Sequence, residues 1–293
     1  MTDAPSQTLD HPGNTLQAAA DRGDLNACFQ MGWNSLIGEG VIQSDAAAVD
    51  YWKQVHEGSA DPVEQPIATL MLGWLHYLGR GTQQDKTKGV ELVRRSKTEL
   101  IPLGEDECFM GRSMPASDSA AARRFFELCR LGSEREWLCK HLVAICHVSG
   151  FGTTKDQEAY VDLFEELAAS GHSDSQVWLG KYYSQDWRSL GDTSRAFQLW
   201  SNAADQDNSY GQYLLGWCYL GGHGVARNYQ KAVEWYRKSA EQGNQHGQSW
   251  LGDCYEEGRK GIAKDIEAAL YWFRLAASQG NEYAQDKLEE LTQ

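Results

Sequence analysis

The chain has 293 residues, of which 41% are hydrophobic and 11% aromatic, so it carries enough apolar surface to fold rather than stay disordered. It holds 27 Lys and Arg residues against 41 Asp and Glu residues, and the formal charge of −14 opposes binding to nucleic acid and to anionic membranes. The first 14 residues lack the basic and apolar regions of a secretory signal, and no run approaches 18 apolar residues. We therefore expect a cytoplasmic protein without a membrane span.

The cysteines favour a reducing compartment. Their number is odd, they form no CxxC pair, and their spacing follows no regular disulfide framework. The seven are Cys28, Cys108, Cys129, Cys139, Cys146, Cys218 and Cys254.

The N-terminal half begins with residues 1–13, which we expect to be flexible, and residues 16–26 resemble the end of a helix. Gly32 and Gly73 then stand at equivalent places in two similar segments, 41 residues apart. The extra residues around 58–66 predict a lengthened loop between these two segments. Such an insertion adds little to the entropic cost of closing the loop.

A degenerate segment follows at residues 98–132. Its first part, residues 98–117, takes the place of a helix but fits the pattern badly, so we expect distorted or loop-like structure there.

A strict repeat of 36 residues follows. A Leu-Gly pair recurs at Gly180, Gly216 and Gly252, and Ala144 fills the same place 36 residues before Gly180. A period of 20–50 residues is the signature of a solenoid, whose units bury their apolar faces against one another. Residues 284–293 read as a last, polar helix that ends the stack.

Each unit predicts two helices, which we call helix A and helix B. Helix A has apolar or small residues at spacings of three and four and stops at a glycine pair such as Gly222 and Gly224. Helix B begins at an Asp or Asn that can accept backbone N–H bonds. These predicted caps are Asp45, Asp85, Asp156, Asp192, Asn228 and Asp265. The predicted core residues of helix B are Trp52, Leu92, Leu163, Phe164, Leu199, Trp200, Trp235, Tyr236, Trp272 and Phe273. The prediction is an all-α solenoid of about seven helix pairs over residues 14–293.

The segment LGWCYLGGHGVARNYQKAVEWYRKSAEQGN at residues 215–244 resembles the Sel-one-like repeat family, a branch of the tetratricopeptide-type α-solenoids. The resemblance implies a right-handed superhelix whose helices A line the concave face, used as a scaffold for protein partners. Some secreted members carry two cysteines per repeat, and some were described as penicillin-binding or β-lactamase-like. That cysteine pattern is absent here, which weakens the enzyme interpretation for this chain.

One stripe of helix A is predicted to face the groove. We call it the helix-A stripe: the residues three before and one after the repeat glycine, which are i and i+4 neighbours. Its candidate partner-binding residues are Phe29, Trp33, Leu70, Trp74, His141, Lys181, Tyr213, Trp217 and Asp253. Tryptophan and tyrosine dominate binding hot spots, so a peptide groove is the functional interpretation. The alternative is that these aromatic residues fill gaps between successive helices A.

The sequence singles out no catalytic or metal site. Cys139, His141, Cys146 and His147 include zinc-ligand types, but on one helix His141 projects roughly 200° away from Cys139, so the four cannot share a tetrahedral ion. We expect no catalytic residues, no metal and no cofactor.

The predicted function is a protein-interaction scaffold that acts as a monomer and binds a peptide or a protein helix on its concave face. The acidic charge favours a neutral or basic partner. Two alternatives remain open: a dedicated inhibitor or immunity partner of a bacterial effector, and a hydrolase of the β-lactamase-like type by family analogy only.

Overall fold

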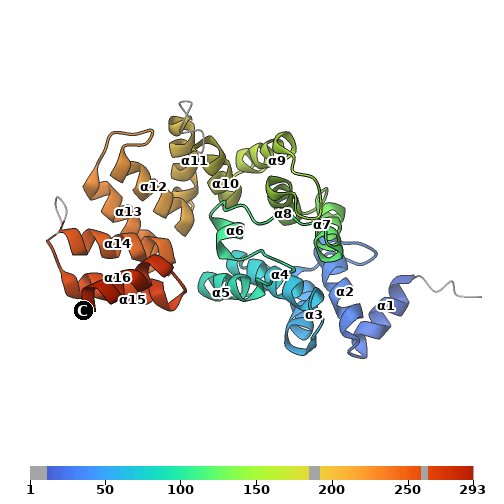
Figure 1. Ribbon diagram of the computed structural model, residues 1–293. Helices are drawn as coiled ribbons and strands as arrows, with labels where there is room; N and C mark the ends of the chain where they lie inside the picture. The colour runs from blue at the N-terminus through green and yellow to red at the C-terminus, as the bar shows by residue number, and fades with distance from the viewer. Residues whose placement is uncertain (1–11, 185–191, 259–262, 293) are drawn as a thin grey trace, which may run out of the picture. The chain divides into compact units, whose positions relative to one another are not determined.

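The computed structural model describes residues 12–184, 192–258 and 263–292, and every regular element within these ranges is a helix (Figure 1). One isolated β-bridge joins Ser117 and Phe151. The helices are α1 (Pro12–Asp21), α2 (Leu25–Ile37), α3 (Asp45–Gly58), α4 (Glu64–Leu78), α5 (Lys86–Ser96), α6 (Glu105–Phe109), α7 (Ala120–Gly132), α8 (Trp137–Ser149), α9 (Gln157–Ala169), α10 (Ser173–Ser184), α11 (Thr193–Asp205), α12 (Ser209–Gly221), α13 (Tyr229–Glu241), α14 (Gln245–Glu257), α15 (Ile266–Ser278) and α16 (Glu282–Thr292). The all-α fold class predicted from the sequence is confirmed. No helix in these ranges is long and apolar enough to cross a lipid bilayer.

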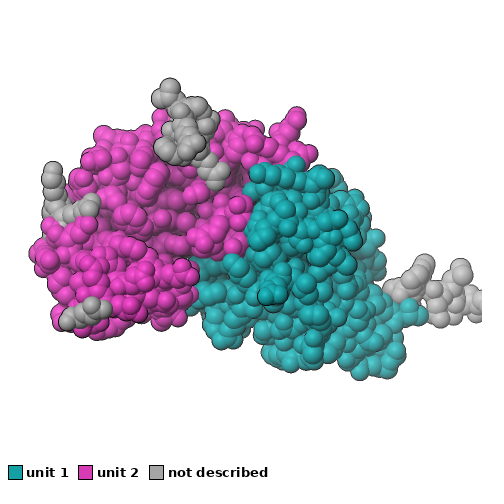
Figure 2. All heavy atoms as spheres, viewed as in Figure 1, with its two compact units in different colours: residues 1–105, 114–155 teal, residues 106–113, 156–293 magenta. Residues whose placement is uncertain are grey.

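The chain divides into two compact units (Figure 2). Unit 1 comprises residues 1–105 and 114–155, and unit 2 comprises residues 106–113 and 156–293. The single continuous solenoid over residues 14–293 stays a prediction. Residues 1–11 of the predicted flexible N-terminus lie outside the described part of the chain.

Each repeat is a helix A packed against the helix B that follows it. The pairs in contact are α2 with α3, α4 with α5, α10 with α11, α12 with α13, and α14 with α15. In unit 2 the helices A also lie side by side, because α10 contacts α12 and α12 contacts α14. Unit 2 therefore presents one continuous face made of successive helices A.

The capping residues of helix B lie where the sequence places them, with one exception. Side-chain oxygens accept the N–H group three residues further on, which satisfies a donor that the helix itself leaves unpaired. The confirmed caps are Asp85, Asp156, Asp192, Asn228 and Asp265. The prediction for Asp45 is wrong by one residue: the Ser44 hydroxyl accepts from the N–H of Ala47, while the Asp45 carboxylate binds Arg80.

The repeat position is a glycine because an aromatic side chain of helix B occupies the space that a Cβ would need. A Cβ on Gly216 would lie 2.7 Å from the Tyr236 ring, and a Cβ on Gly252 would lie 2.7 Å from the Phe273 ring. Both rings are completely buried. The Leu-Gly pair thus sets how closely the two helices of a repeat approach each other.

The segment 98–117, expected to be distorted, contains a single short helix, α6, and is otherwise irregular. Its residues 106–113 belong to unit 2 although the helices on either side of them belong to unit 1.

Candidate protein-binding surface

In unit 1 the helix-A stripe is buried. Phe29, Trp33, Leu70, Trp74 and His141 each have 2% or less of their surface exposed. Trp33 packs edge-on against Trp52 of helix α3 with ring centroids 5.4 Å apart, and Trp74 packs edge-on against His141 at 5.5 Å. The expectation that these five residues face an open groove does not match their burial. They fill gaps between helices, because large aromatic rings gain most when both faces are covered.

In unit 2 the same stripe is partly exposed. Lys181, Tyr213, Trp217 and Asp253 each retain accessible surface. Trp217 stacks on His223 with ring centroids 3.8 Å apart and an angle of 13° between the rings. We call the side of α10, α12 and α14 that carries these four residues the unit 2 face. It is the part of the predicted stripe that a partner could reach.

A piece of the chain itself lies on the unit 2 face. Within residues 106–113, the Phe109 ring stacks on Tyr210 of α12 with centroids 5.2 Å apart. The indole N–H of Trp178, on α10, donates a hydrogen bond of 2.9 Å to the carbonyl of Cys108. Phe109 and Cys108 are completely buried in these contacts. The segment is thus held by an aromatic stack and by a hydrogen bond to its backbone.

Polar contacts hold the start of this segment, whereas two like charges lie near each other at its end. At its start, the Asp106 carboxylate lies 3.0 Å from Nε2 of His246 on α14 and 3.1 Å from Arg112. At its end, Arg112 lies close enough to Lys181 for its positive charge to add to burial, the larger cause, in lowering the pKa of that lysine. The segment thus makes polar contacts with α10 and α14 and an aromatic contact with α12.

A cavity of about 230 Å³ lies beside His246 on the same face. Four of its lining residues come from one side of α14, at helical spacings of three and four, and two come from the start of α16. They are His246, Ser249, Trp250, Asp253, Asn281 and Tyr283. The Tyr283 hydroxyl donates a 2.8 Å hydrogen bond to Asp253, and Asn281 caps α16 by accepting from the N–H of Ala284. Ser249 and Asp253 stand three residues before and one residue after the repeat glycine Gly252. Both stripe positions of α14 therefore line this cavity.

The pKa of Tyr283 is raised well above its usual range. Desolvation of this half-exposed ring is the largest cause, followed by the hydrogen bond to Asp253 and by the negative charge of that carboxylate. The phenol stays protonated and keeps donating to Asp253, which fixes the carboxylate at the cavity wall.

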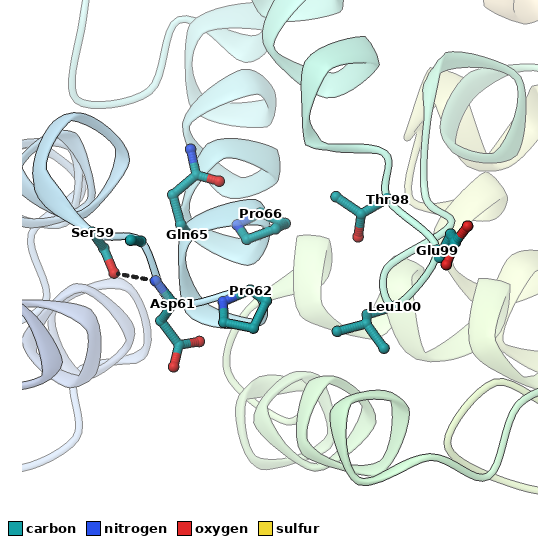
Figure 3. Close-up of a pocket in the computed structure, with 9 residues that line it drawn as sticks. Ser59, Asp61, Pro62, Gln65, Pro66, Thr98, Glu99 and Leu100 are labelled. Atoms are coloured by element: carbon teal, nitrogen blue, oxygen red, sulfur yellow. Dashed lines mark hydrogen bonds between the residues drawn. The ribbon is translucent and has the colours of Figure 1, made fainter.

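A second cavity, of about 400 Å³, lies in unit 1 between the α3–α4 connection and residues 98–100 (Figure 3). Figure 3 shows Pro62, Pro66 and Leu100 around it. The nearby Asp61 carboxylate accepts from the N–H groups that begin α4, and these bonds lower the pKa of Asp61. This carboxylate thus caps the start of a helix, and none of the residues that line the cavity belongs to the helix-A stripe.

The four residues considered for zinc do not gather around one point in the described part of the chain. Cys139, His141 and Cys146 are completely buried, and His147 bonds the carbonyl of Thr154 at 3.3 Å. Burial raises the pKa of both thiols, which disfavours the thiolate that zinc binds. Among the described residues, no three potential metal ligands gather around one point.

The sequence pattern of the Sel1 repeat matches the chain at residues 25–54, 66–97, 173–208, 209–244 and 245–281. A solved structure of a protective antigen from uropathogenic Escherichia coli, which displays an SLR fold, is 28% identical, with a TM-score of 0.50 over 94% of this chain. This chain spans only 58% of that antigen. A Sel1 repeat protein from Oxalobacter formigenes is 20% identical, with a TM-score of 0.48 over 89% of this chain and 90% of its own. Because the five matched repeats make up more than half of the sequence, the chain belongs to the Sel1 repeat family.

Proposed function

We propose that this protein is an interaction scaffold that binds a peptide or a helix of a partner protein on the unit 2 face. Proteins built from Sel1 repeats generally act as scaffolds for protein–protein interaction. The observation that carries the proposal is the segment 106–113, which the unit 2 face holds by a ring stack and a hydrogen bond to a backbone carbonyl. Beyond the groups that hold this segment, the face keeps accessible aromatic side chains, Tyr213 and Trp217, for a partner to bind.

The remaining accessible groups on the face support a partner of neutral or basic character. Trp217 offers a large ring and Asp253 a carboxylate, and the whole chain carries a charge of −14. The seven cysteines are all buried free thiols, which agrees with action in a reducing compartment such as the cytoplasm. The inhibitor alternative differs in having one tight partner, so the number of proteins captured separates it from a scaffold.

Trp217→Ala is expected to weaken partner capture by at least about tenfold, because a partly exposed tryptophan at the centre of an interface is worth roughly 2 kcal/mol or more. The measurement compares the proteins captured from the native lysate by the wild-type chain and by the variant, quantified by mass spectrometry. Thermal unfolding of the variant, followed by circular dichroism, is expected to change far less than capture.

Trp235→Ala is the matched control. Trp235 is also half-buried, but it lies on helix B α13, where the ammonium of Lys238 stands 4.0 Å from its ring centroid. Its removal is expected to leave capture intact. Equal loss of capture in both variants, or a loss of capture that is explained by unfolding, would contradict the proposal that partners bind the unit 2 face.

A further inference from the structure

The cavity between α14 and α16 has one rigid aromatic wall. Trp250 stacks on Tyr236 with ring centroids 5.7 Å apart and 20° between the rings, and a side-chain hydrogen bond joins it to Tyr213. Tyr236 is completely buried, so the stack is anchored in the core of the repeat. The indole therefore presents a fixed ring surface to whatever enters the cavity.

The cavity lies in a negative electrostatic environment. The carboxylates of Asp253, Glu256 and Glu290 each add to burial in raising the pKa of Tyr283. Lys287 bridges two of them, at 3.1 Å from Glu256 and 3.2 Å from Glu290. One lysine among three carboxylates leaves a net negative charge beside the wall that Asp253 forms.

The size of the cavity suits one side chain. Its volume of about 230 Å³ is below the ~300–1,000 Å³ of pockets that enclose drug-sized ligands. Its lining residues Ser249 and Asp253 lie on the unit 2 face, and its lining residue His246 contacts the segment 106–113, so an occupant can belong to a longer chain lying along that face.

We propose that this cavity receives an arginine side chain of the partner peptide, an inference that rests on the function proposed above. The planar guanidinium can lie on the Trp250 ring while its N–H groups donate to Asp253. A carboxylate accepts up to about four hydrogen bonds, so Asp253 can accept from Tyr283 and from a guanidinium together. A glutamate in the same place would meet the Asp253 charge and be rejected.

The test uses three capped pentapeptides, Gly-Ala-X-Ala-Gly, in which X is arginine, its neutral isostere citrulline, or glutamate. Each is titrated into the full-length ¹⁵N-labelled protein while the indole N–H resonance of Trp250 is followed, with the resonance assigned by its loss in Trp250→Phe. Nuclear magnetic resonance detects the millimolar dissociation constants expected for so short a peptide. The arginine peptide is expected to give a saturable shift and to bind at least about tenfold more tightly than the citrulline peptide, while the glutamate peptide gives none.

Asp253→Asn is expected to remove the preference for arginine over citrulline. Asp286→Asn, which makes the same charge change at an exposed position on α16 outside the cavity, is expected to keep it. Equal affinity for arginine and citrulline, a preference that survives Asp253→Asn, or no saturable shift with arginine would overturn the inference. The capture experiment with Trp217→Ala depends on none of these outcomes, so the two proposals fail separately.

Discussion

Replacing Gly224 by alanine is expected to lower the free energy of unfolding of unit 2 by about 3–5 kcal/mol. Gly224 has φ +69°, a conformation that costs an L-amino acid about 1–2 kcal/mol. An added Cβ would also fall far inside van der Waals contact with the carbonyl of Thr193, the first residue of α11, and would lie 3.0 Å from Cβ of Phe197. Because the carbonyl of Thr193 is part of the backbone of the preceding repeat, it cannot move away from the added Cβ unless α11 shifts.

Gly171→Ala separates strain from crowding. Gly171 has φ +91° but would meet no atom within 4 Å of an added Cβ, so its replacement is expected to cost only the conformational term of about 1–2 kcal/mol. Urea unfolding of both variants, followed by circular dichroism, measures the difference. Equal losses would show that the tight turn between repeats does not depend on the contact with Thr193. An added Cβ on Gly81 or Gly152 would meet the backbone of Asp45 or Ala122 in the same way. The close approach of a turn glycine to an earlier helix therefore occurs at two further turns.

Arg80→Ala is expected to destabilise unit 1 by about 3 kcal/mol, the lower end of the range for a broken buried ion pair. Arg80 lies 2.6 Å from Glu136 and 2.7 Å from Asp45, and Glu136 is only 4% exposed. Burial lowers the pKa of Arg80, but its hydrogen bonds to Glu136 and Asp45 outweigh this effect and hold the pKa above its ordinary value. Glu136 also caps α8 through the N–H of Leu138, so removal of the arginine leaves a buried charge at the start of that helix.

Arg95→Ala is the control for this variant. Arg95 pairs with Glu91 on the same helix at 2.6 Å, but both side chains are at least half exposed. Exposed pairs of this kind contribute at most about 0.5 kcal/mol. Denaturant unfolding of the two variants compares them directly, and a loss for Arg80→Ala within about 1 kcal/mol of the control would contradict a structural role for the Arg80 network.

The repeat could be predicted from the sequence because its signals are local. A glycine facing an aromatic ring of helix B, as at Gly216 and Gly252, recurs at a fixed period, and an Asp or Asn cap depends only on its own helix. The exception is α3, which Ser44 caps in place of Asp45. The Asp45 carboxylate binds Arg80 instead, and Arg80 lies 35 residues away in the sequence, so no local pattern predicts this contact.

The accessibility of the helix-A stripe could not be predicted in the same way. Periodicity identifies the position of Trp74 and Trp217 equally well, but exposure depends on what packs over each ring. Trp74 is covered by the contacts of unit 1, whereas Trp217 keeps surface in unit 2. The contact between Asp106 and His246 joins residues 140 positions apart, and its only trace in the sequence is that residues 98–117 fit the repeat badly.

Hydrogen–deuterium exchange of the full chain, with and without a captured partner, tests most directly whether the unit 2 face is the binding surface. Binding is expected to slow amide exchange in α10, α12 and α14 and at the start of α16, because a partner that covers this face stabilises those helices against local opening. Slowed exchange confined to α11, α13 and α15, or to unit 1, would contradict the account.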